Sequence, residues 1–166
     1  HRTCAAEISF IEDEHDVMKV EENMVQAAIK NVAEKNSEEL EKFGIQVKVP
    51  SVPFPELKFP DVYDILAEMG KKLPLGEDLD HESELLLTKY VEEKYKSEIF
   101  FVNRFPFKAK PFYVMKYDED PQYARSVDLI YKGVELSSGG QREHRYEKII
   151  EQAKEKKINP DTIMWF

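Results

Sequence analysis

Hydrophobic and polar residues alternate most regularly in the segment from residue 125 to residue 145. Two alternating runs, Ser126–Tyr131 and residues 134–137, flank the pair Lys132-Gly133. Period-two alternation that is interrupted by a two-residue glycine turn is typical of a β-hairpin. We therefore expect these two runs to pair as antiparallel strands.

Each of these two strands carries one carboxylate among apolar neighbours. Asp128 alternates with the apolar residues of the first strand, and Glu135 lies between Val134 and Leu136, which we expect to be buried. A buried carboxylate needs a partner, and two carboxylates that face one groove repel unless a cation lies between them. Asp128 is equally compatible with a structural salt bridge and with a site that binds magnesium or a substrate amine.

The rest of the chain alternates between helical and extended patterns. Apolar residues at three- and four-residue spacing predict helices at 16–35, 60–70, 80–94 and 143–156. The first helix is expected to pack one face on a sheet, and Tyr146 and Ala153 are expected to face inward in the last. Short apolar or alternating runs predict strands at 7–12, 45–49, 99–102 and 111–117. The proline-rich segment 50–60 is expected to be an extended surface connector. The predicted fold class is α+β, an antiparallel β-sheet flanked by helices.

Capping residues mark two helix starts. Asp13 or Asp16 is suited to cap the first long helix, and Asp80 to cap the helix that runs to Lys94. The acidic loop 74–80 precedes Asp80 directly. Its spacing does not match a calcium-binding loop, so we expect a solvated turn.

Composition limits the classes of function. The 166 residues are enough for one domain with a sizeable core, and a net charge of −9 disfavours a large electrostatic footprint for nucleic acid. The single cysteine, Cys4, excludes an internal disulfide and fits a reducing cytoplasm. Histidines and cysteine show no zinc-ligand spacing, and no apolar run reaches membrane-spanning length. Because the chain does not begin with Met, we expect it to be a piece of a longer protein.

Two cationic residues accompany the hairpin. Arg142 follows Gly139 and Gly140, whose small size allows a ligand to approach the backbone closely. An arginine can bind a carboxylate or a phosphate through two parallel hydrogen bonds, although an exposed or helix-capping cation fits this pattern equally well. Lys110 stands at the entry to the predicted strand 111–117, and its position alone indicates only a surface lysine. His144 is expected to lie on a solvated helix face and not to be catalytic.

These segments together resemble a known family. Lys110-Pro-Phe-Tyr, then Asp128, then Gly133-Val-Glu-Leu-Ser-Ser-Gly-Gly-Gln-Arg-Glu-His-Arg145 is similar to the archaeal-type aspartyl branch of the class II aminoacyl-tRNA synthetases. Phe10-Ile-Glu-Asp-Glu-His-Asp-Val-Met18 and the segments 73–78 and 105–111 also fit this family, so the resemblance covers nearly the whole chain.

The resemblance implies an aspartate–tRNA ligase that activates aspartate with ATP and transfers it to the aspartate tRNA. By that resemblance, Arg142 and Lys110 would hold the side-chain carboxylate of aspartate, and Tyr113, Asp128 and Ser138 would line the same pocket. Glu135 would bind ATP through its Mg²⁺, with Ser138 as a second ligand of the metal.

The resemblance also implies what surrounds this segment. It corresponds to part of a catalytic domain, with the anticodon-binding domain and the dimer-forming first motif of the family absent from residues 1–166, and with the third motif expected after Phe166. The parent protein is expected to be a cytoplasmic homodimer, and the segment alone is expected to be inactive. Two other functions remain open: a related asparagine synthetase, which would pass aspartyl adenylate to ammonia, and a non-catalytic binding module that keeps the fold.

Overall fold

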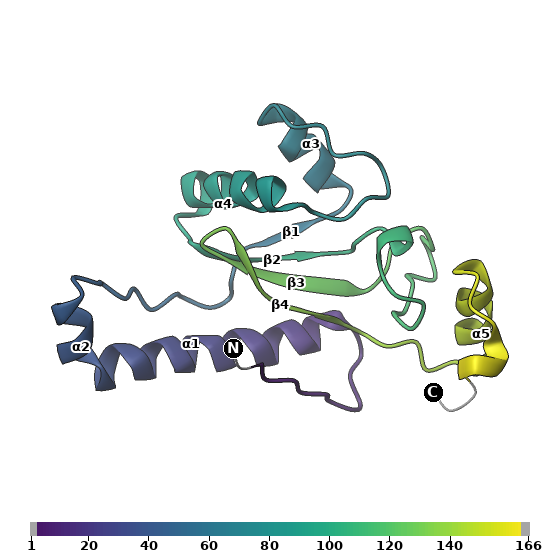
Figure 1. Ribbon diagram of the computed structural model, residues 1–166, viewed down its shortest axis with the longest axis horizontal. Helices are drawn as coiled ribbons and strands as arrows, with labels where there is room; N and C mark the ends of the chain where they lie inside the picture. The colour runs from purple at the N-terminus through teal and green to yellow at the C-terminus, as the bar shows by residue number, and fades with distance from the viewer. Residues whose placement is uncertain (1–2, 164–166) are drawn as a thin grey trace. The chain divides into compact units, whose positions relative to one another are not determined.

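The computed structural model describes residues 3–163, which divide between two units, His1–Pro53 and Phe54–Phe166 (Figure 1). The first unit contains α1 (Glu14–Lys35) and α2 (Ser37–Lys42). The second contains the sheet, three further α-helices and two short 3₁₀ helices. The expectation of one domain over the whole chain stays a prediction.

Helix α1 begins at the predicted cap. The carboxylate of Asp13 accepts a hydrogen bond from the backbone N–H of His15 at 2.8 Å, which confirms one of the two candidate caps. Of the apolar residues of α1, Met18 is 6% exposed, whereas Val20 and Met24 are 52% and 53% exposed. The strands predicted at 7–12 and 45–49 are wrong: both segments are irregular. A strand needs a backbone partner, and the described residues of this unit form no sheet.

The second unit is built on a four-stranded sheet in the order β1-β2-β3-β4. The strands are β1 (Glu56–Lys58), β2 (Ile99–Asn103), β3 (Ser126–Tyr131) and β4 (Val134–Gly140). β2, β3 and β4 pair in antiparallel fashion, as predicted, whereas β1 pairs with β2 in parallel. The hairpin turn is confirmed, because Lys132 and Gly133 both have positive φ angles, 51° and 79°, as a type I′ turn requires.

Only the start of the proline-rich segment is a surface connector as predicted: residues 51–53 are exposed, whereas the part from Phe54 on contains buried residues. Phe54, Leu57 and Phe59 are 5%, 5% and 0% exposed. Leu57 is the central residue of β1. Prolines are tolerated here because they flank an edge strand and need not donate to the ladder. The carbonyl of Pro55 still accepts a hydrogen bond from the N–H of Phe101 at 2.9 Å.

The strand predicted at 111–117 is also wrong. This segment turns after the 3₁₀ helix η1 (Phe107–Ala109) and makes only isolated bridges, Val114 with Arg142 and Lys116 with Ala124. Pro111 has no N–H to donate, and its carbonyl accepts from the N–H of Val114 at 3.2 Å, which bends the chain locally.

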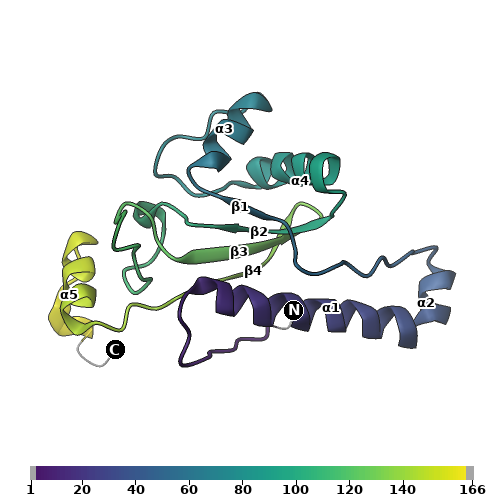
Figure 2. The same cartoon turned by 180° about the vertical axis from the view of Figure 1, so that it is seen from behind.

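Helices α3 (Asp61–Glu68) and α4 (His81–Tyr95) lie together on one side of the sheet (Figures 1 and 2). They bury an apolar core against it, made of Val62, Leu66, Leu87 and Val91 from the helices and Phe100, Val102 and Ile130 from the strands. Burial of this apolar area is the main stabilising contribution to the unit.

Helix α5 (Tyr146–Glu155) and the 3₁₀ turn η2 (Pro160–Ile163) complete the unit. Ala153 is fully buried, as predicted. Tyr146 is 60% exposed, so the prediction that it faces inward is wrong. Tyr146 is the first residue of the helix, where side chains have fewer neighbours to pack against. Within residues 3–163, no helix is both long enough and apolar enough to cross a membrane.

The predicted cap of α4 is confirmed and provides a test of stability. Asp80 accepts from the N–H of Ser83 at 2.8 Å, and its carboxylate lies 2.8 Å from Nζ of Lys71. The hydrogen bond from Lys71, followed by those from Ser83, lowers the pKa of Asp80 from 3.8 to about 2.

We predict that Asp80→Ala lowers the free energy of unfolding by about 1 kcal/mol at pH 7, because the helix loses its cap. Since the pKa of Asp80 is depressed in the folded chain, its contribution is fully present above pH 3.8 and is lost as the pH falls through about 2. Urea denaturation followed by circular dichroism at several pH values measures this difference. Asp80→Asn, which still caps but does not titrate, should lose little stability at pH 7; an equal loss in both variants would contradict the capping role.

Candidate active site

A β-bulge sets the orientation of the carboxylates on the hairpin. Leu129 of β3 pairs with Ser137, but the next residue, Ile130, pairs with Glu135, so Leu136 is the extra residue of β4. In a regular strand, residues three apart point to opposite faces. The bulge instead brings Glu135 to the face that carries Ser138, the partner of Asp128.

Lys110 reaches this face from the loop after η1. The residue is only 9% exposed, and its Nζ lies 3.1 Å from Oδ2 of Asp128. The same Nζ lies 3.2 Å from Oδ2 of Asp78 and 3.7 Å from the centre of the Phe105 ring. Lys110 is therefore a buried cation held between two carboxylates and an aromatic face, and not the surface lysine that its position in the sequence indicates.

The cluster carries more negative than positive charge. Burial raises the pKa of Asp128, while the charge of Lys110 acts in the opposite direction. Partial burial, and then the charge of Asp128, raise the pKa of Glu135, with smaller contributions from Glu84 and Asp78. Both shifts favour the protonated carboxyl groups. A further cation that binds beside them would lower their pKa values and so stabilise the charged carboxylates.

Arg142 lies just beyond the end of β4. Its bridge with Val114 continues the extended backbone of β4. Ser138, Gly140 and Arg142 follow one another at two-residue intervals, so they lie on the same face. The guanidinium lies 5.6 Å from the centre of the Tyr113 ring, and the Arg142 side chain is exposed. Its neighbour Gln141 is buried, and its side-chain oxygen accepts a hydrogen bond from Arg125 at 2.9 Å. The N–H of Gln141 donates to the carbonyl of Arg125 and the N–H of Glu143 to that of Tyr113, so the backbone is anchored on either side of Arg142.

The six candidate residues thus form two groups. Lys110, Asp128, Glu135 and Ser138 gather on one face of the β3–β4 hairpin, and Arg142 pairs with Tyr113 at its end. The binding roles assigned to them stay predictions. The expected burial of Val134 and Leu136 is wrong, since they are 59% and 51% exposed. β4 is the last strand of the sheet, where side chains have neighbours on one side only.

Asp78 is a residue that the sequence did not indicate. The loop 74–80 is largely exposed, as expected of a solvated turn. Asp78 nevertheless binds the buried Lys110, and the N–H of Gly76 donates to the hydroxyl of Tyr63 at 2.9 Å. Asp78 and Lys110 are 32 residues apart, and no local pattern connects them.

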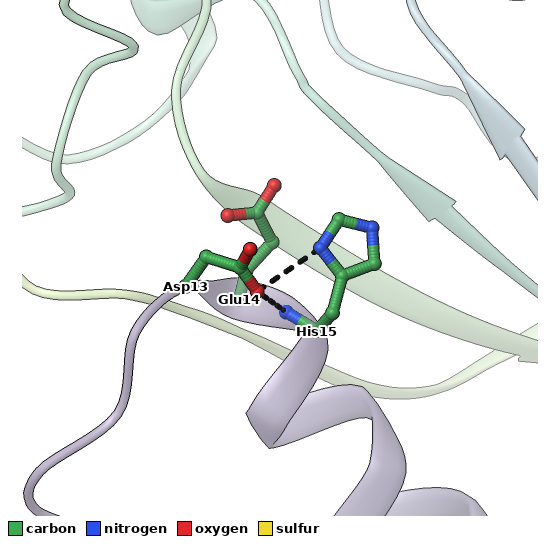
Figure 3. Close-up of side chains that lie close together, drawn as sticks. All are labelled: Asp13, Glu14 and His15. Atoms are coloured by element: carbon green, nitrogen blue, oxygen red, sulfur yellow. Dashed lines mark hydrogen bonds and ion pairs between the residues drawn. The ribbon is translucent and has the colours of Figure 1, made fainter.

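A second group of charged side chains lies at the start of α1. Possible ligand atoms of Asp13, Glu14 and His15 all lie within 4.8 Å of one another (Figure 3). Asp13 already accepts from the N–H of His15 as the helix cap and lies 3.1 Å from its Nδ1. The capping geometry accounts for the closeness of Asp13 and His15, and we assign no metal to this group.

Comparison with known proteins relates the whole chain to one family. The family model described as tRNA synthetases class II (D, K and N) matches residues 1–166. An aspartate–tRNA(Asp) ligase of Pyrococcus furiosus is 48% identical over 161 residues, which are 97% of this chain and 37% of that protein. An aspartate–tRNA(Asp/Asn) ligase of Aeropyrum pernix is 36% identical over 96% of this chain and 37% of its own length. The chain therefore spans little more than a third of these relatives.

Solved structures show the same fold. Aspartyl-tRNA synthetase from Entamoeba histolytica superposes with a TM-score of 0.84 and 25% identity, over 93% of this chain and 32% of that one. An asparaginyl-tRNA synthetase from Pyrococcus horikoshii, complexed with asparaginyl-adenylate, gives a TM-score of 0.81 and 29% identity over 92% of this chain and 35% of that one. These matches confirm the predicted fold class.

The two glycines before Gln141 differ in what they permit, and this difference can be tested. A Cβ on Gly140 would lie 2.5 Å from the carbonyl oxygen of Arg125 and 2.9 Å from Cα of Ser126, both backbone atoms. A Cβ on Gly139 meets nothing within 4 Å. We predict that Gly140→Ala lowers the free energy of unfolding by about 1–3 kcal/mol, because β3 and β4 must separate. Gly139→Ala is the matched control and should change it by less than about 0.5 kcal/mol. Urea denaturation of both variants measures the difference, and equal stability would contradict the close approach of the two strands.

Proposed function

Since the chain belongs to the class II tRNA synthetase family (D, K and N), we propose that it forms part of the catalytic domain of an aspartate–tRNA ligase. The relatives that match nearly all of this chain carry that name, and they cover both tRNA(Asp) and tRNA(Asp/Asn) ligases. Which of these tRNAs the parent protein charges is left open by this proposal.

The observation that carries the proposal is the buried Lys110 on the face shared by Asp128, Glu135 and Ser138. A buried ammonium and an exposed guanidinium are groups that can select an acidic side chain over its amide. An amide would lose the charge-assisted hydrogen bonds and would turn its NH₂ toward cationic donors. Lys110 and Arg142 would hold the side-chain carboxylate of aspartate, and Tyr113 would line the pocket beside Arg142.

The proposed reaction has two steps. An oxygen of the α-carboxylate of aspartate attacks the α-phosphorus of ATP, the bond to the bridging oxygen breaks, and pyrophosphate leaves. A ribose hydroxyl at the end of the tRNA then attacks the acyl carbon, and AMP leaves. In this scheme the residues of this chain position the amino acid and compensate its charge, which is the main contribution of the protein to phosphoryl and acyl transfer.

The acidic face fits a divalent cation. Glu135 and Ser138 offer a carboxylate and a hydroxyl oxygen on the same face, which are ligands that Mg²⁺ prefers. Partial burial, and then the charge of Asp128, raise the pKa of Glu135. We propose that these two residues hold Mg²⁺, which would neutralise charge on the phosphates of ATP when bound.

The parent protein is proposed to act as a cytoplasmic homodimer on aspartate, ATP and the aspartate tRNA. Because the chain spans 37% of its archaeal relatives, these properties belong to a longer protein. The exposed Cys4 is compatible with a reducing compartment.

The proposal is tested in the full-length parent through aspartate-dependent exchange of pyrophosphate into ATP. The unmodified protein should exchange with aspartate and far less with asparagine. We predict that Arg142→Leu lowers kcat/KM for aspartate by about a hundredfold or more, because it removes a charge-assisted partner of the substrate carboxylate, and that it abolishes the preference for the acid.

Arg145 offers a matched control. Its guanidinium binds Glu143 and Asp118 at 2.8 Å instead of facing the hairpin site, so Arg145→Leu should leave the ratio of the two amino acids unchanged. Equal exchange with aspartate and asparagine in the unmodified protein would reject aspartate as the selected substrate. Exchange without any charging of tRNA would favour an asparagine synthetase, and no exchange would favour a binding module.

A further inference from the structure

Two carboxylates and one aromatic ring of the chain already surround the Lys110 ammonium. An ammonium group has three donors and no acceptor. One points to Asp128 at 3.1 Å and one to Asp78 at 3.2 Å, and the aromatic face of Phe105 lies 3.7 Å from Nζ. Lys110 is 9% exposed, so a carboxylate that arrives from solvent must compete with these partners for the ammonium.

The three partners differ in how readily they can withdraw. Phe105 is fully buried in the apolar core, and the side chain of Asp128 is 6% exposed on the central strand β3. The side chain of Asp78 is 46% exposed and lies in the irregular loop between α3 and α4. Exposing Asp78 to water costs little, whereas removing Phe105 or Asp128 would disrupt the core.

We propose that Asp78 is an internal competitor of the substrate: its carboxylate forms an ion pair with Lys110 until the side-chain carboxylate of aspartate replaces it. This inference rests on the proposed function and adds a residue that sets the affinity for aspartate. The exchange of one carboxylate for another keeps the charge around the buried ammonium constant, so the lysine is never left without compensation.

The remaining contacts of the loop are compatible with such a release. Gly76 donates to the hydroxyl of Tyr63, and Glu77 pairs with Lys108 at 2.7 Å between side chains that are 54% and 70% exposed. Exposed ion pairs contribute little to stability. The N–H of Leu79 donates to Asp78 itself, and the Leu79 side chain packs against the apolar core. The Asp78 carboxylate can therefore leave Lys110 while Leu79 stays packed and Asp80 continues to cap α4 through Ser83.

The experiment compares Asp78→Asn with the unmodified full-length protein in aspartate-dependent pyrophosphate exchange. When a ligand must displace an internal group, its apparent Kd equals the intrinsic Kd divided by the fraction of molecules in which that group is already withdrawn. The apparent affinity therefore rises when the internal group is removed. We predict that Asp78→Asn lowers KM for aspartate by ~3- to 10-fold and changes kcat by less than about twofold, the effect of losing one partly exposed ion pair. KM for asparagine should fall by the same factor, since the internal carboxylate opposes either ligand equally. Glu77→Gln is the matched control, because it removes the neighbouring carboxylate of the same loop, and it should change neither constant.

Hydrogen exchange provides a second readout that a structural role alone would not produce. Amides of residues 76–79 should exchange faster when aspartate is added to the unmodified protein, and should exchange fast without aspartate in Asp78→Asn. An unchanged or raised KM in Asp78→Asn, or slower exchange of the loop on adding aspartate, would overturn the proposal. If the unmodified protein shows no aspartate-dependent exchange of pyrophosphate, the proposed function itself fails, an outcome distinct from these.

Discussion

The contact on which the site depends is the ion pair between Lys110 and Asp128. Both side chains are more than nine-tenths buried, and an ammonium or a carboxylate buried alone would be strongly destabilising. Each residue therefore requires the other to stay in place. Asp128 is held by pairing with Val102 on one side and Ser138 on the other, so the position of Lys110 is tied to the register of β2, β3 and β4.

The hairpin adds two irregular features to this register. The bulge at Leu136 turns Glu135 to the face of Asp128 and Ser138, and Gly140 lets β4 approach the backbone at Arg125. Both are local departures from a regular ladder, and both lie between the charged residues of the site. Such departures are common beside functional sites because they re-aim individual side chains without changing the sheet.

The fold alone does not select the amino acid. Aspartyl and asparaginyl relatives superpose on this chain almost equally well, so the backbone is compatible with an acid and with an amide. Under the proposed function, selection would come from the charges on the shared face. The balance of Lys110 against Asp78 and Asp128, together with Arg142, is the feature of this chain that bears on that choice.

The sequence by itself determined the hairpin 126–137, its turn at Lys132-Gly133 and the cap at Asp80, because these depend on local periodicity and turn chemistry. The candidate site residues came from the family resemblance, and their binding roles stay predictions. The sequence did not determine β1, the bend at 111–117 or the exposure of Val134 and Leu136, which depend on pairing and on which faces other elements cover. Only the tertiary structure joined Asp78 to Lys110, and only the bulge decided that Glu135 and Ser138 share a face. Contacts between residues that are far apart in the chain leave no periodic signal, because they arise from the packing of whole elements and not from the order of neighbours.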